Sequence, residues 1–138
     1  MALDYKVSEE SAREQLDAMY DYYEIDFDEL PEKLAPVLKA TDAKLLKAVR
    51  LGRVEMALGD DGVIVVTQHL RSGGDPLVYR EIDGQAKVAM GAKDADDAYG
   101  KAYALMGALC GLGETAITKL KSHDLAVVEC LGTVFLQA

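Results

Sequence analysis

The sequence predicts an α+β fold with N-terminal helices, a small antiparallel sheet of about four strands in two hairpins, and C-terminal helices. Apolar residues recur at three- and four-residue steps at both ends of the chain, as in amphipathic helices. Between them lies a stretch of alternating polar and apolar residues, interrupted by Gly59-Asp60-Asp61-Gly62 and by Asp83-Gly84, which favour hairpin turns. The length of 138 residues fits a single domain, 1–138. An N-terminal helical subregion, 1–52, followed by a β and C-terminal helical region, 53–138, is the alternative division.

Helix signals dominate the first part of the chain. Ser8 precedes Glu9 and Glu10, which places a hydroxyl cap and two carboxylates at a helix start. Pro31 favours the first turn of a second helix, and Pro36 predicts that this helix is short or kinked. Thr41-Asp42 predicts the start of a third helix, which ends at Gly52. We therefore expect three helices before the sheet.

Two pairs of strands are expected in the middle of the chain. Residues 53–58 alternate polar and apolar side chains, and residues 63–67 are almost all β-branched. The turn at 59–62 joins them as a first hairpin. Residues 77–82 and 85–90 flank Asp83-Gly84, the strongest short hairpin signal in the sequence, and form the predicted second hairpin.

Helices return after residue 93. Asp94, Asp96 and Asp97 mark the start of a long helix that Gly111-Leu112-Gly113 ends. Gly100 and Gly107 lie inside it, and each costs about 1 kcal/mol relative to alanine in a helix. We therefore expect another element to pack closely there. A short helix follows over residues 114–120, and a last helix begins with Ser122 as its cap.

The charge distribution restricts the partners of the protein. The net charge of −9 disfavours binding to nucleic-acid phosphates and favours a basic partner. No apolar run approaches the roughly 20 residues that span a bilayer, and the N-terminus lacks the order of a signal peptide. The expected location is therefore the cytoplasm, without a membrane partner. Acids dominate residues 4–29 and bases dominate residues 33–53, so we expect these two segments to pair.

The residues that usually carry chemistry are few and scattered. His69 and His123 have no sequence-near acid–base partner, and Cys110 and Cys130 form no closely spaced pair for zinc. The acids of residues 24–29 lack the glycine and the closing glutamate of a calcium loop. The sequence therefore predicts no catalytic, metal or cofactor site, and a protein that is not an enzyme. We expect a protein-binding factor, and the alternative is an acidic regulatory or inhibitory protein-binding module.

Residues 63–138 contain a pattern of short segments. They are Leu77-Val78-Tyr79-Arg80-Glu81, then Asp96-Asp97, and then the succession of Tyr103–Glu114, Ala116-Ile117, Leu120, Asp124-Leu125 and Leu131–Phe135. This pattern resembles the tail assembly chaperones of tailed bacteriophages. It implies a chaperone, made in the host cytoplasm, that binds the tape-measure protein and helps recruit tail-tube subunits. The helical region from Ser8 to Leu51 has no counterpart in that pattern.

The resemblance also suggests which residues contact a partner. Helix-in-groove binding would use exposed parts of the last long helices, with Tyr99, Tyr103, Met106 and Phe135 as candidate anchors. The alternative is that all four side chains belong to the core. A homo-oligomer is also compatible with the sequence.

Overall fold

The computed structural model describes residues 3–138 and confirms the α+β class. It contains six α-helices, one short 3₁₀ helix and one antiparallel sheet of three strands. In chain order these are α1 (Glu9–Tyr22), η1 (Phe27–Glu29), α2 (Ala35–Arg50), β1 (Val54–Leu58), β2 (Ile64–Gln68), β3 (Leu77–Tyr79), α3 (Gly84–Gly91), α4 (Ala98–Cys110), α5 (Glu114–Thr118) and α6 (Ser122–Phe135). Over residues 3–138, none of the helices has the length and hydrophobicity needed to cross a bilayer.

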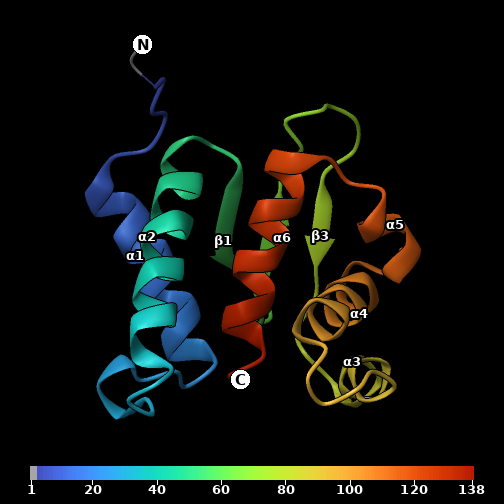
Figure 1. The fold of residues 1–138 in the computed structure, drawn as a ribbon. Helices are drawn as coiled ribbons and strands as arrows, with labels where there is room; N and C mark the ends of the chain where they lie inside the picture. The colour runs from blue at the N-terminus through green and yellow to red at the C-terminus, as the bar shows by residue number, and fades with distance from the viewer. Residues whose placement is uncertain (1–2) are drawn as a thin grey trace.

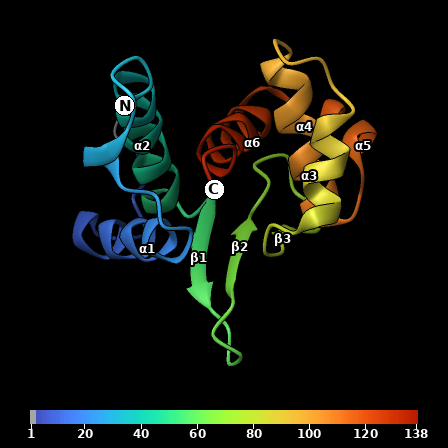
Figure 2. The ribbon, with the colours of Figure 1, turned by 90° about the horizontal axis from the view of Figure 1, so that it is seen from below.

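The sheet occupies the centre of the molecule, and α6 covers one of its faces (Figures 1 and 2). The pair α1–α2 lies beside β1, and α3, α4 and α5 lie on the side of β3. One buried core runs through all of these parts, from Leu16 of α1 through Val66 of β2 to Leu109 of α4 and Leu131 of α6. Tyr22 and Tyr23, at the end of α1, also contact Glu81 and the Ile82 amide beyond β3.

The strands run in the order β1-β2-β3, and both neighbouring pairs are antiparallel. Leu58 pairs with Ile64 next to the turn, which confirms the first predicted hairpin. Alternation places Val54, Met56, Ile64 and Val66 in the core, whereas Glu55 points to solvent. The sheet therefore has one buried face, and α6 lies over it, while α1 and α2 contact β1 and α4 contacts β3 (Figure 2).

The predicted second hairpin is wrong, because residues 84–91 form helix α3 and the sheet has three strands instead of four. Asp83 has an extended backbone, and its side chain accepts a hydrogen bond from the Ala86 amide at 3.0 Å. It is therefore the N-cap of a helix, which is the other structure that an Asp-Gly pair supports. Val88 is 75% exposed, so no sheet neighbour buries the apolar residues expected of a strand.

The second and third predicted helices are one continuous helix, α2. Pro36 lies in its first turn, where an absent N–H costs no hydrogen bond, so the helix is not interrupted. The Thr41 hydroxyl donates to the Val37 carbonyl inside the helix at 2.9 Å instead of capping a new one. The break was predicted from Thr41, and threonine is a residue type that also fits a helix interior.

The helices after residue 93 follow the prediction more closely. Asp97 caps α4 by accepting a hydrogen bond from the Gly100 amide at 2.9 Å. A Cβ on Gly107 would lie 2.6 Å from the Gly113 carbonyl oxygen and the Glu114 amide nitrogen, which confirms the expected close packing at that position. At Gly100 the nearest atoms belong to the Asp97 carboxylate that caps the same helix, so the expectation of another element is wrong there. Ser122, however, is not the cap of α6: Lys121 holds that position and provides no side-chain hydrogen bond.

The acidic and basic segments do not pair as expected. Among the described residues, no salt bridge joins an acid of 4–29 to a base of 33–53. The ion pair between the two segments has the opposite polarity, since Arg13 of α1 binds Asp42 of α2. Most of the charged side chains in both segments are exposed to solvent.

Candidate functional site

The structure separates the four candidate anchor residues. Met106 and Phe135 are 0% and 2% exposed, so in this conformation both side chains belong to the core, the alternative that the sequence left open for them. Phe135 packs against the Tyr23 ring, with 5.5 Å between ring centroids. Tyr103 is partly buried, and its hydroxyl donates to the Glu129 carboxylate at 2.9 Å. Tyr99 is 65% exposed, so it is the one member of the set with a largely free side chain.

Tyr99 lies at the side of a groove of about 470 Å³, which we call the α6 groove. Figure 2 shows α6 between α2 and α4, and residues of these three helices line the groove. Most of the lining side chains are small or apolar. They are Val37, Thr41 and Lys44 of α2; Ala98, Tyr99 and Ala102 of α4; and Ala126, Glu129, Cys130, Thr133, Leu136 and Gln137 of α6 and the residues after it.

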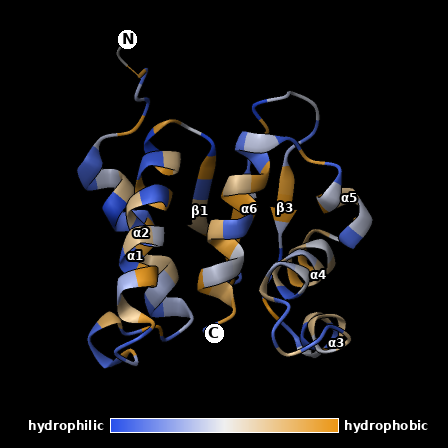
Figure 3. Ribbon diagram, in the orientation of Figure 1, coloured by the Kyte–Doolittle hydropathy of each residue, from blue (hydrophilic) through white to orange (hydrophobic). Residues whose placement is uncertain are grey.

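The α6 groove is formed by small side chains along one stripe of α6. Ala126, Cys130 and Thr133 recur at four- and three-residue steps, so they lie on one face of the helix. Val37, on α2, is 51% exposed beside them. In Figure 3, mostly hydrophobic and neutral colours cover α6, with few hydrophilic segments. A surface of this kind suits an apolar partner better than a charged small molecule.

A smaller hollow of about 170 Å³ continues the α6 groove toward the N-terminal end of α6. The two share Lys44, Ala126 and Cys130, so they form one continuous surface. The character of the surface changes along this direction, because the smaller hollow is bordered by basic residues. It is lined by Lys44, Lys47, Ala48, Leu51, Arg53, His123, Ala126, Val127 and Cys130.

Two titratable groups in and next to the α6 groove, the Cys130 thiol and the Tyr103 hydroxyl, have raised pKa values. Burial raises the pKa of the Cys130 thiol, and the Lys44 ammonium opposes this effect only in part. The thiol is therefore protonated near neutral pH and is a poor nucleophile. Burial, together with the hydrogen bond to Glu129, raises the pKa of Tyr103 to about 12. Both groups are therefore neutral at about pH 7.

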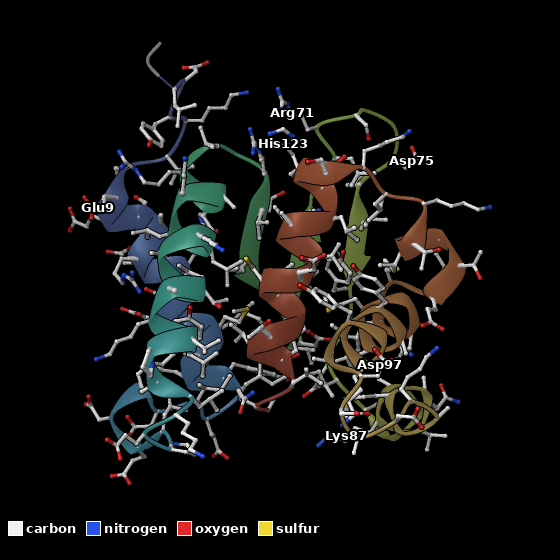
Figure 4. The ribbon with its side chains drawn as sticks, viewed as in Figure 1. Glu9, Arg71, Asp75, Lys87, Asp97 and His123 are labelled. Carbon is white, nitrogen blue, oxygen red and sulfur yellow. The ribbon has the colours of Figure 1, made fainter. Side chains whose placement is uncertain are left out.

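A polar network connects the sheet with the beginning of α6. The buried Asp124 carboxylate accepts hydrogen bonds from the Arg71 amide at 2.6 Å, the Ser72 amide at 3.3 Å and the Ser72 hydroxyl at 2.9 Å. The Gln68 side chain donates to the Asp124 carbonyl at 2.8 Å and accepts from the Tyr79 hydroxyl. Asp124 thereby holds the loop that places Arg71 against His123 (Figure 4).

A second cleft, of about 750 Å³, lies at the end of α1 and is strongly acidic. Arg13 binds both carboxylate oxygens of Asp42, at 2.9 and 2.8 Å, and the Tyr20 hydroxyl donates to the same carboxylate at 2.6 Å. The hydrogen bond to Asp42 raises the pKa of Arg13, and burial raises that of Tyr20. Among the described residues that line this cleft, Arg13 is the only base, and it is already paired. The other lining residues are Asp17, Asp21, Glu24, Ile25, Asp26, Phe27 and Asp28.

Within residues 3–138, no group of three or more His, Cys, Asp or Glu side chains is placed to hold a metal ion. His69 contacts the exposed Glu55 at 2.9 Å, and His123 contacts Arg71, so each histidine has a surface partner. No protein-family model, curated protein or solved structure matches the chain. A function is therefore inferred from the shape and the lining residues of the protein surface.

Proposed function

We propose that this protein is a non-enzymatic binding factor and that its α6 groove binds an amphipathic helix of a protein partner. The observation that carries the proposal is the groove itself, in which small side chains on α6 lie between α2 and α4 with Tyr99 and Val37 exposed beside them. A helix with an apolar face of Leu or Ala side chains fits such a surface. Tyr99 would contribute a large contact area at a low cost in conformational entropy.

The resemblance of residues 63–138 to phage tail assembly chaperones suggests the partner. On this proposal the protein acts in the host cytoplasm, where it covers apolar helical segments of the tape-measure protein and helps recruit tail-tube subunits. It does so without catalysis or a cofactor. The helices that line the α6 groove include α2, which lies outside the resembling segment. Residues 1–52 would therefore contribute one wall of the binding surface.

Co-expression with the tape-measure protein of the same phage genome tests the proposal. We expect the native chain to keep the tape-measure protein in the soluble fraction. Val37→Asp places a charge in the α6 groove and should abolish this effect. Val88→Asp is the matched control, because Val88 is a helical valine with 75% exposure that does not line the α6 groove. A tape-measure protein that stays insoluble with the native chain, or stays soluble with Val37→Asp, would refute the proposal.

The acidic cleft favours a second candidate, an acidic regulatory or inhibitory module that binds a basic protein segment. Asp21, Glu24 and Asp28 line this cleft and have no salt-bridge partner among residues 3–138. The Tyr20 and Phe27 rings, whose centroids lie 4.8 Å apart, line the same cleft. Binding there would weaken steeply with salt. It would be lost in an Asp21→Asn, Asp26→Asn double variant and unaffected by Val37→Asp. The two candidates are thus distinguished by which variant loses the partner.

A further inference from the structure

The surface at the N-terminal end of α6 is positively charged, although the protein as a whole has a net charge of −9. Lys44, Lys47 and Arg53 line the smaller hollow that continues the α6 groove there. In the part of the chain that the structure describes, none of them has a salt-bridge partner. Figure 4 shows Arg71 and His123 together at the same end. The N-terminus of α6 adds the positive end of a helix dipole.

The residues that line the α6 groove and its smaller continuation are spaced along their helices as in helix pairs that pack against a third helix. On α2 and its C-cap, Val37, Thr41, Lys44, Ala48 and Leu51 recur at alternating four- and three-residue steps. On α6, Ala126, Cys130 and Thr133 follow the same steps. The helices α2 and α6 pack side by side and run in opposite directions (Figure 1). With 16 and 14 residues they are about 24 and 21 Å long, so they match a partner helix of about 15 residues.

We infer that the helix bound in the α6 groove carries carboxylates on the flank that faces Lys44, Lys47 and Arg53. This inference rests on the function proposed above and specifies the chemistry of the partner. The small side chains of α6 provide the apolar contact, and the basic border selects an acidic helix over a basic one. Since Lys44 and Lys47 are exposed, the selection is sensitive to ionic strength.

Two designed peptides of about 15 residues test the inference. They share one stripe of Leu and Ala and a matched helix content, and they differ only in carrying Glu or Lys on the flanks. We expect the Glu peptide to bind at least about tenfold more tightly by fluorescence anisotropy, and this ratio to fall toward one at about 1 M salt. In NMR spectra, both the Val37 and the Ala126 signals should shift.

Charge-reversal variants provide the matched control. The double substitution Lys44→Glu, Lys47→Glu should reverse the preference so that the Lys peptide binds better. Lys33→Glu, Lys39→Glu changes the net charge by the same amount, outside the residues that line the α6 groove, and should leave the preference intact. A preference that changes equally in both double variants reflects overall charge and overturns the inference.

The remaining outcomes separate the inference from the proposed function. If both peptides bind in the α6 groove with equal affinity, the groove keeps its proposed function and the inference is wrong. If neither binds at about 1 mM, the proposed function fails as well. If sedimentation shows a dimer that Lys44→Glu, Lys47→Glu dissociates, the occupant is a second copy of the chain, and the inference is overturned.

Discussion

Replacing Gly107 with alanine tests the packing of α4 against the turn that leads to α5. A Cβ on Gly107 would lie 2.6 Å from the Gly113 carbonyl oxygen and from the Glu114 amide nitrogen. Carbon and oxygen atoms normally approach to about 3.3–3.6 Å, so the turn would have to move by at least about 0.7 Å. That movement would stretch the hydrogen bond from the Gly113 amide to the Gly107 carbonyl, now 3.0 Å long.

The change in the free energy of unfolding on Gly107→Ala is the balance of opposing contributions. Overpacking costs about 1–3 kcal/mol, the stretched hydrogen bond costs about 1 kcal/mol, and the higher helix propensity of alanine returns about 1 kcal/mol. The net expectation is a loss of about 1–3 kcal/mol in the free energy of unfolding, or about 3–10 °C in Tm for a chain of this size. The destabilisation thus exceeds the gain in helix propensity.

Urea unfolding followed by circular dichroism measures this change. Gly91→Ala is the matched control, because no atom lies within 4 Å of a Cβ built there and α3 ends at that residue. It should be neutral or stabilising by up to about 1 kcal/mol. A Gly107→Ala protein as stable as the native chain would refute the packing of the turn against α4.

Three further outcomes are expected. Asp124→Ala removes the acceptor of three hydrogen bonds and should lower the free energy of unfolding by about 2–3 kcal/mol. Ser72→Ala should lower it by about 1 kcal/mol. Equal losses in urea unfolding would show that the Asp124 carboxylate does not anchor the loop. Stability should also fall as the pH rises above 10, because the hydrogen bond from Tyr22 to Glu81 and the burial of Tyr103 raise the pKa of each to about 12, while unfolded tyrosines ionise near 10. Above about pH 10 the unfolded state binds fewer protons than the folded state, so the free energy of unfolding falls as the pH rises. A free energy of unfolding that is unchanged between about pH 9 and about pH 11 would contradict this prediction. Tyr99→Ala should change stability by less than about 0.5 kcal/mol, because its side chain is mostly exposed, and a larger loss of Tm would place it in the core.

The sequence was sufficient where one residue type allowed one local structure. Ser8 caps α1, Asp97 caps α4, and the 59–62 turn joins β1 to β2. Prediction from the sequence failed where the same residues fit two local structures. Asp83-Gly84 suits a hairpin turn or a helix start, and the choice depends on whether a fourth strand has a neighbour to pair with, which is a tertiary property. The prediction of two separate helices in the region of α2 failed for a similar reason, because the Thr41 hydroxyl forms a hydrogen bond within the helix.

The candidate site was predicted only in part. Tyr99 is exposed on the predicted helix, but Met106 and Phe135 lie on faces that other elements cover. Periodicity identifies an apolar stripe without showing whether a neighbour inside the molecule already fills it. The α6 groove was missed because Val37, Ala126 and Cys130 come from two helices far apart in the chain and are of types common in any core. Their four- and three-residue spacing was the available signal.

Photo-crosslinking from position 99 tests the binding of a partner helix in the α6 groove most directly. A photoreactive phenylalanine analogue replaces Tyr99 in one variant and Val88 in another, and each is produced in cells together with the tape-measure protein. We predict a covalent adduct with the tape-measure protein from position 99 and none from position 88, with the linked tape-measure residues on the apolar face of a helix. No adduct from position 99, or equal yields from both positions, would contradict the account.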